Sequence, residues 1–154
     1  MSIAAALARD TRMVDWMGTR YAITVGKSDS AGLIGVFEGI VPAGDGPPLH
    51  IHHNEDEVLH VVEGAYEFWL DGRIVCGGPG FSIFLPRGVA HTFRIVGDRP
   101  GRNLGIVTPG GFENFFVEAA THDLQIPQHM PELVALAGRY SLEFLGPAPW
   151  GAMR

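Results

Sequence analysis

Short runs of β-branched and aromatic residues, separated by glycine and proline, recur along most of the chain. The 21 Gly and 11 Pro residues are spread over 154 positions and are not gathered into a linker. Such runs are typical of a β-sandwich or β-barrel, because a strand needs only a few residues to cross a sheet. The pattern therefore predicts an all-β fold.

The expected strands share a high content of Val, Ile, Phe and Tyr and are bounded by turn residues. They are 21–25, 33–41, 50–53, 57–62, a hairpin that turns at Asp71-Gly72, 81–85, 91–96 and 104–108. Beyond residue 111 the apolar period becomes helical, which predicts helices at 112–119 and 131–140. We expect one domain over residues 1–154, with a barrel core at about 20–110, a helical segment at about 111–145 and an irregular tail over 146–154.

Composition narrows the classes of function. Hydrophobic residues make up 46% of the chain and charged residues 18%, which argues against disorder. The net charge is −6 and the 11 Lys and Arg residues are scattered, so no basic stripe follows a phosphate backbone. No run reaches the roughly 20 apolar residues of a membrane helix, and Met1–Leu7 lacks the pattern of a signal peptide. We expect a cytoplasmic protein that binds neither nucleic acid nor membranes.

Cys76 is the single cysteine, so an internal disulfide is excluded and a reducing compartment is expected. Its apolar neighbours Ile74 and Val75 favour buried packing over a reactive thiol, because a free cysteine behaves as a small hydrophobic residue. The same count excludes a structural zinc site built from thiolates.

Two histidines two residues apart point to a metal site. His50 and His52 lie on one expected strand, so their side chains share a face and reach the barrel interior at one height. His53 has the opposite parity and should point away. His91 follows a later turn, Pro86-Arg87-Gly88, and can supply a third nitrogen from across the barrel.

Glu57 adds a carboxylate to this set. It starts the strand after His52, on the face that it shares with Leu59 and Val61, whereas His60 lies on the opposite face. Neutral imidazoles with one carboxylate suit a divalent first-row metal and leave coordination positions open for a substrate or dioxygen. Iron, nickel, manganese, cobalt, copper and zinc all accept such ligands, so the residues predict one divalent transition metal per chain without choosing among these.

The spacing around the two histidines resembles the first motif of the cupin superfamily. That motif runs Gly, five residues, His-x-His, three or four residues, Glu, six residues and Gly. Here Gly44 and Gly64 flank His50, His52 and Glu57 at these separations. The resemblance implies a double-stranded β-helix, or jelly-roll barrel, with short C-terminal helices.

A later segment resembles the second cupin motif. Gly80, Pro86-Arg87-Gly88 and His91 match its spacing, and Ile95 stands where the family often has an Asn that is not a metal ligand. The two motifs together cover residues 44–95, about a third of the chain. The resemblance implies that all four candidate residues are metal ligands.

A narrower resemblance, to small bacterial cupins similar to quercetin 2,3-dioxygenase, extends over most of residues 33–120. It is carried by segments 41–53, 84–91 and 108–116. In flavonol-cleaving cupins the ligand carboxylate helps to remove the substrate's proton, and dioxygen then opens the ring with loss of carbon monoxide. The resemblance implies that Glu57 is both ligand and general base, with dioxygen and an aromatic small molecule as substrates.

The expected substrate pocket uses apolar residues that share a strand face with a metal ligand: Leu59, Val61, Phe93 and Ile95. Such a wall suits a planar apolar compound held by a few polar contacts. Phe112, Phe115 and Phe116 either form a lid over the barrel mouth or pack the helix that they begin, and we favour packing.

Three functions stay open. A metal-dependent dioxygenase acting on a flavonol or a related enolisable aromatic compound would consume oxygen. A non-redox isomerase, lyase or hydrolase would use the metal as a Lewis acid and work without oxygen. A non-enzymatic small-molecule binding module would be stabilised by a ligand that it releases unaltered. We favour the dioxygenase, and we expect a homodimer from the family likeness and because two-fold dimers are the commonest assembly.

Overall fold

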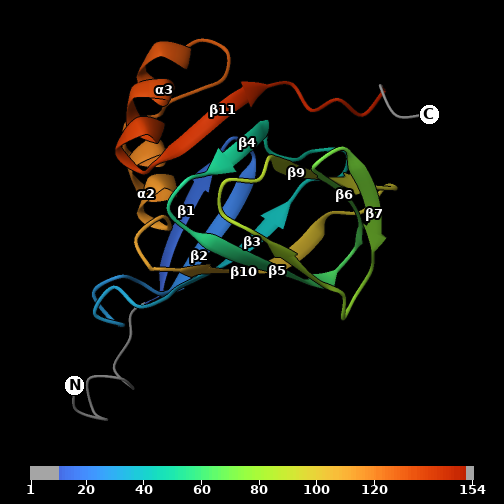
Figure 1. Cartoon of the computed structure of the whole chain (residues 1–154), viewed down its shortest axis with the longest axis horizontal. Helices are drawn as coiled ribbons and strands as arrows, with labels where there is room; N and C mark the ends of the chain where they lie inside the picture. The colour runs from blue at the N-terminus through green and yellow to red at the C-terminus, as the bar shows by residue number, and fades with distance from the viewer. Residues whose placement is uncertain (1–10, 152–154) are drawn as a thin grey trace.

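Two antiparallel sheets pack face to face in the computed structural model, which describes residues 11–151 (Figure 1). In spatial order, the six-stranded sheet contains β1 (Arg12–Trp16), β2 (Thr19–Val25), β3 (Gly35–Val41), β10 (Gly101–Thr108), β5 (Asp56–Glu63) and β8 (Ser82–Leu85). The five-stranded sheet contains β11 (Leu142–Gly146), β4 (Leu49–His52), β9 (His91–Val96), β6 (Ala65–Leu70) and β7 (Arg73–Gly77). The predicted all-β jelly-roll barrel with C-terminal helices is confirmed.

Alternation along the strands places the core between the sheets. In β5 every second residue is buried, namely Glu57, Leu59 and Val61. The neighbouring β10 alternates in the same way, with Asn103 and Val107 among its buried residues. Because successive side chains of a strand point to opposite faces, one face of each strand lines the barrel interior. This interior face carries the candidate site.

Two helices cover one side of the barrel (Figure 1). They are α2 (Asn114–Thr121) and α3 (Met130–Arg139), which lie within two residues of the predicted helices at both ends. α2 buries Phe115 and Phe116, and α3 buries Leu133 against the same apolar cluster. The helical segment is therefore part of the core and forms one wall beside the site.

The sequence pattern misses two strands, β1 and β11. β1 pairs with β2 along its whole length, and β11 pairs with β4, where Leu142 lies opposite His52 and Phe144 opposite His50. Runs this short carry little strand signal of their own, and pairing with a neighbouring strand decides their conformation. β11 thus covers the edge of the strand that bears two of the candidate ligands.

The expectation that Cys76 is buried is wrong. The side chain is exposed, because β7 is an edge strand and Cys76 lies on its outer face, next to the half-buried Val75. Within residues 11–151 no helix is both long and apolar enough to span a bilayer. The segment Met1–Leu7 and the last residues of the expected irregular tail, 152–154, lie outside the described residues.

Candidate metal centre

The four candidate ligands meet at one point between the sheets. His50 and His52 come from β4 and His91 from β9, whereas Glu57 comes from β5 in the opposite sheet. Each offers one ligand atom, and these atoms all lie within 4.8 Å of one another. All four side chains are buried, and His50 is the most exposed at 8%. The structure thus brings together the residues that the sequence selects.

The two histidines of opposite parity lie outside this cluster. The exposed ring of His53 contacts Glu143 on β11, with 2.7 Å between Nε2 and Oε2. His60 on β5 contacts the hydroxyl of Ser82 at 2.7 Å from its Nδ1 atom. Strand parity therefore separates the two groups of histidines, as the alternation of side chains requires.

Backbone hydrogen bonds orient two of the imidazoles. Nδ1 of His50 donates to the carbonyl oxygen of Pro48 at 2.7 Å, and Nδ1 of His91 donates to that of Val89 at 3.0 Å. Because a carbonyl oxygen only accepts, the single proton of each neutral ring lies on Nδ1, and Nε2 keeps its lone pair. Fixing the tautomer in this way is how proteins prepare an imidazole for a metal.

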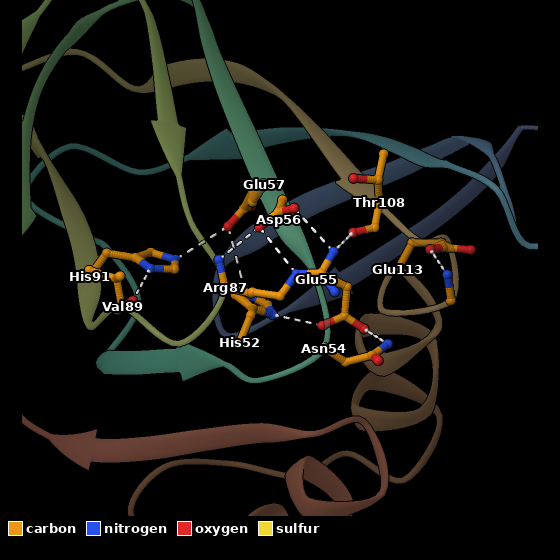
Figure 2. A network of polar contacts seen from close by, with 11 residues as sticks. His52, Asn54, Glu55, Asp56, Glu57, Arg87, Val89, His91, Thr108 and Glu113 are labelled. Atoms are coloured by element: carbon orange, nitrogen blue, oxygen red, sulfur yellow. Dashed lines mark hydrogen bonds and ion pairs between the residues drawn. The ribbon is translucent and has the colours of Figure 1, made fainter.

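The carboxylate of Glu57 faces two of these rings (Figure 2). Its Oε2 atom lies 3.3 Å from Nε2 of His91 and 3.6 Å from Nε2 of His52. Among residues 11–151, Nε2 of His91 has no hydrogen-bond partner. Buried polar atoms are almost always partnered, so a lone pair left beside a carboxylate oxygen indicates a place for a shared cation.

The electrostatics favour the protonation states that bind metal. Burial lowers the pKa of His50 well below its ordinary value, and the neighbouring His91 and His52 lower it further. Burial acts to raise the pKa of Glu57, but the contact with His91 and the positive charges that His52 and His91 carry when protonated outweigh it, so the pKa lies below its ordinary value. A neutral imidazole and an ionised carboxylate are the forms that coordinate a metal.

The donor set fits a divalent transition metal. Three imidazoles and one carboxylate are borderline ligands that suit first-row ions, and they leave further coordination positions free. The orphaned Nε2 of His91 and the fixed tautomers of His50 and His91 support this fit. The cluster is therefore capable of binding a metal ion.

Glu55 is a buried residue of this centre that the sequence interpretation missed. It is 4% exposed, and its Oε2 atom lies 3.5 Å from Nδ1 of His52 (Figure 2). Glu55 lies directly before β5 and two residues before Glu57, so extending the parity of that strand by one residue places both on the same face. That parity was the available signal, and it was outweighed by the polar character of residues 53–56, which is typical of a solvated loop.

A cavity of about 850 Å³ opens beside the four ligands, which lie on its wall. Most of the remaining wall is apolar and strongly aromatic: Trp16, Tyr21, Phe37, Phe93, Phe112, Phe115, Phe116, Phe144 and Trp150. Its few other polar residues include Thr19, Arg94 and Asn103. A volume of this size and an apolar wall with few polar groups are typical of small-molecule sites.

The four residues expected in the substrate pocket divide into two pairs. Leu59 and Phe93 line the cavity. Val61 and Ile95 do not line it, and they are buried at 0% and 1% exposure in the apolar core. Each lies two residues further from the ligand on its strand, where opposing side chains fill the barrel.

The phenylalanines at the start of the helical segment are core residues. Phe112, Phe115 and Phe116 are at most 8% exposed and pack with one another. The ring of Phe112 also meets that of His52 edge to face, with centroids 4.3 Å apart. They pack the helix, as favoured above, and they form cavity wall at the same time.

Residues 37–107 match the family model of the cupin domain. Over 96 residues the chain is 27% identical to quercetin 2,3-dioxygenase of Bacillus subtilis, and over 80 residues 31% identical to the protein of that name from Aspergillus japonicus. These matches cover 62% and 47% of this chain but 28% and 22% of those proteins. The chain thus spans less than a third of the length of the curated relatives that it matches.

Solved structures share the fold. A predicted oxalate decarboxylase from Thermotoga maritima gives a TM-score of 0.59 at 18% identity, covering 68% of this chain and 96% of that chain. The polyketide cyclase RemF from Streptomyces resistomycificus gives 0.54 at 27% identity, covering 67% and 75%. Residues 37–107 are therefore similar to the cupin domain, and the chain is similar in sequence to part of the quercetin 2,3-dioxygenases.

Proposed function

We propose that this protein is a metal-dependent dioxygenase of the quercetinase-like type, which cleaves a flavonol or a related enolisable aromatic compound. The observation that carries the proposal is the four-ligand cluster on the wall of an apolar, aromatic-lined cavity. Similarity to two quercetin 2,3-dioxygenases over the cupin domain supports the same chemistry.

His50, His52, Glu57 and His91 are the residues that would hold one divalent transition metal. When bound, such an ion supplies a Lewis acid for a substrate oxyanion and a binding position for dioxygen. The protein contributes the oriented imidazoles and the carboxylate, all of them buried.

Glu57 is the group that accepts the substrate's proton. Its pKa lies below the ordinary value, so the side chain is a carboxylate at neutral pH, and it lies on the cavity wall. When an enol hydroxyl of the substrate reaches this wall, the proton passes to a carboxylate oxygen of Glu57 and the electron pair stays on the substrate oxygen. The Oε2 atom of Glu57 lies beside the Nε2 atoms of His52 and His91, the nitrogens that would share the metal with it.

The cavity wall favours a flat aromatic substrate. Tyr21 and Phe116 stack on its wall with ring centroids 3.9 Å apart, and Phe37 and Phe112 add further aromatic surface. Asn103 is the buried amide on this wall. Its Nδ2 atom donates to the hydroxyl of Tyr66 at 3.0 Å, which leaves its carbonyl oxygen to accept a hydrogen bond from a substrate hydroxyl.

Oxygen uptake with quercetin as the probe tests this proposal. Chelator-stripped protein is loaded in turn with iron, manganese, cobalt, nickel and copper, and oxygen consumption and carbon monoxide release are recorded. We expect both with at least one metal, and neither with the Glu57→Gln variant. Absence of oxygen uptake with every metal and with a panel of related enediols would overturn the dioxygenase proposal.

A non-redox metal enzyme is the second candidate. The likeness to the polyketide cyclase RemF, at 27% identity over 67% of this chain, favours it. Such an enzyme would use the same four ligands and cavity with a redox-inert ion such as zinc. Turnover of an aromatic or enolisable compound by the zinc-loaded protein under nitrogen would favour this candidate over the dioxygenase.

A further inference from the structure

Each imidazole of the candidate centre needs an acceptor for its Nδ1 proton once Nε2 binds a metal. His50 and His91 donate to backbone carbonyl oxygens at 2.7 and 3.0 Å. His52 has no such carbonyl, and its Nδ1 atom has no hydrogen-bond partner among the described residues. The nearest acceptor given for it is Oε2 of Glu55, 3.5 Å away.

Glu55 shows the matching deficit. Its Oε1 atom accepts from the amide of Asn54 at 3.1 Å, whereas its Oε2 atom is buried and lacks a hydrogen-bond partner in residues 11–151. The side chain of Glu55 is 5% exposed and that of His52 is 2% exposed. Nδ1 of His52 needs an acceptor and Oε2 of Glu55 needs a donor. A proton on Nδ1 of His52 that is donated to Oε2 of Glu55 would satisfy both buried atoms.

A second buried glutamate shows that this arrangement is not simply what burial produces. Glu113 is 0% exposed, and its two oxygens accept the backbone N–H groups of Lys27 and Gly111 at 2.6 and 2.7 Å. Glu113 therefore has a structural role that is complete without a ligand. The Oε2 atom of Glu55 has no such partner and faces the ring of His52 (Figure 2).

We propose that Glu55 is a positioning residue of the metal centre, which accepts the Nδ1–H of His52 and so directs the Nε2 lone pair of that ring toward the metal. This inference rests on the metal centre proposed above. The negative charge of Glu55 makes Nε2 of His52 a stronger electron-pair donor to the metal and stabilises the added cation. Of the three imidazoles, only His52 has a side chain as the acceptor for its Nδ1 atom. A point substitution can therefore remove the acceptor of His52, but not the backbone acceptors of the other two.

Titration of Co²⁺ into chelator-stripped full-length protein tests the proposal, with calorimetry for affinity and visible absorption for coordination. Glu55→Ala should weaken Co²⁺ binding by roughly 10- to 100-fold and alter the Co²⁺ absorption bands. Glu55→Gln should lose less, because its amide oxygen still accepts the Nδ1–H but carries no charge. The matched control is Glu143→Gln, which removes the carboxylate beside the exposed His53 and should leave Co²⁺ affinity unchanged.

Thermal unfolding of the metal-free variants separates positioning from structural damage. Removing a buried carboxylate whose Oε2 atom lacks a hydrogen-bond partner should leave the metal-free stability unchanged or raise it. The role of Glu55 would be overturned if Glu55→Ala kept the wild-type Co²⁺ affinity and absorption spectrum. It would also be overturned if Glu55→Ala and Glu143→Gln weakened Co²⁺ binding to the same extent. Failure of the wild-type protein to bind Co²⁺ would instead overturn the metal centre and this inference with it. Neither result depends on dioxygenase activity, so the test of Glu55 is separate from the test of the proposed reaction.

Discussion

The Nε2 atom of His91 lies 3.3 Å from the Oε2 atom of Glu57, although their strands belong to opposite sheets of the barrel. A cation held by both side chains therefore links the two sheets directly. A ligand that binds only the folded chain stabilises it by mass action. The proposed metal is thus expected to be part of what holds this barrel together.

Metal addition should consequently raise the melting temperature of chelator-stripped protein. At a metal concentration of about 100 times Kd the stabilisation is about 2.7 kcal/mol. Glu57→Gln should show a clearly smaller increase, because Glu57 is the only candidate ligand from the six-stranded sheet. Differential scanning fluorimetry checks both, and an equal increase in the two proteins would contradict a metal that bridges the sheets.

Replacing Asn103 by Leu should weaken substrate binding without removing the metal. The substitution deletes the amide on the cavity wall, and losing one hydrogen bond of about 1 kcal/mol raises KM roughly 3- to 10-fold. Steady-state kinetics with quercetin, or with whichever related enediol the oxygen-uptake assay turns over, gives KM, and elemental analysis gives the metal content. Tyr66→Phe is the control, since it removes the partner of Asn103 but keeps its carbonyl oxygen. An unchanged KM would show that Asn103 does not contact substrate.

Glu113→Ala should destabilise the fold by about 3 kcal/mol, because the backbone N–H groups of Lys27 and Gly111 lose a buried, charged acceptor. Gly35→Ala should act on the same network, since a Cβ atom there would clash with Oε2 of Glu113. Urea unfolding measures both, with the exposed Glu132→Ala as a neutral control. Equal stability of the Glu113 and Glu132 variants would refute this role.

Tyr140→Phe should cost about 1 kcal/mol at neutral pH, because the Tyr140 hydroxyl donates to Glu118 and so ties the end of α3 to α2. The hydrogen bond from Tyr140 lowers the pKa of Glu118, burial opposes this effect, and Arg139 lowers the pKa further. Burial and Glu118 raise the pKa of Tyr140. The hydrogen bond between Tyr140 and Glu118 therefore stabilises the fold fully at pH values that lie between the ordinary pKa of Glu and the ordinary pKa of Tyr.

The difference between Tyr140→Phe and wild type should accordingly shrink at both ends of the pH range. It is lost in acid as pH falls through the lowered pKa of Glu118, and in base as pH rises through the raised pKa of Tyr140. Melting temperatures measured across the pH range give the profile. A difference that is constant with pH would mean that the hydroxyl acts through packing alone.

Strand parity accounts for most of what the sequence predicts correctly. The His50–His52 pair and Glu57 reach one point because a strand alternates its side chains, and His53 and His60 leave it for the same reason. The two helices follow from their apolar period and from the break before them. These features are local, so the sequence alone expresses them.

The features that were missed depend on contacts between distant segments. β11 is a strand because it pairs with β4, and Cys76 is exposed because β7 has a neighbour on one side only. Val61 lies outside the cavity because opposing side chains fill the barrel at its level. Glu55 is the exception, since its parity with Glu57 was visible in the sequence.

Metal content of protein purified without chelator tests the central claim most directly. Elemental analysis of the wild type, of the His50→Ala, His52→Ala double variant and of a His53→Ala, His60→Ala double variant compares histidines inside and outside the cluster. We predict one transition-metal ion per chain in the wild type and in the second variant, and almost none in the first. Equal metal content in all three proteins would contradict the metal centre.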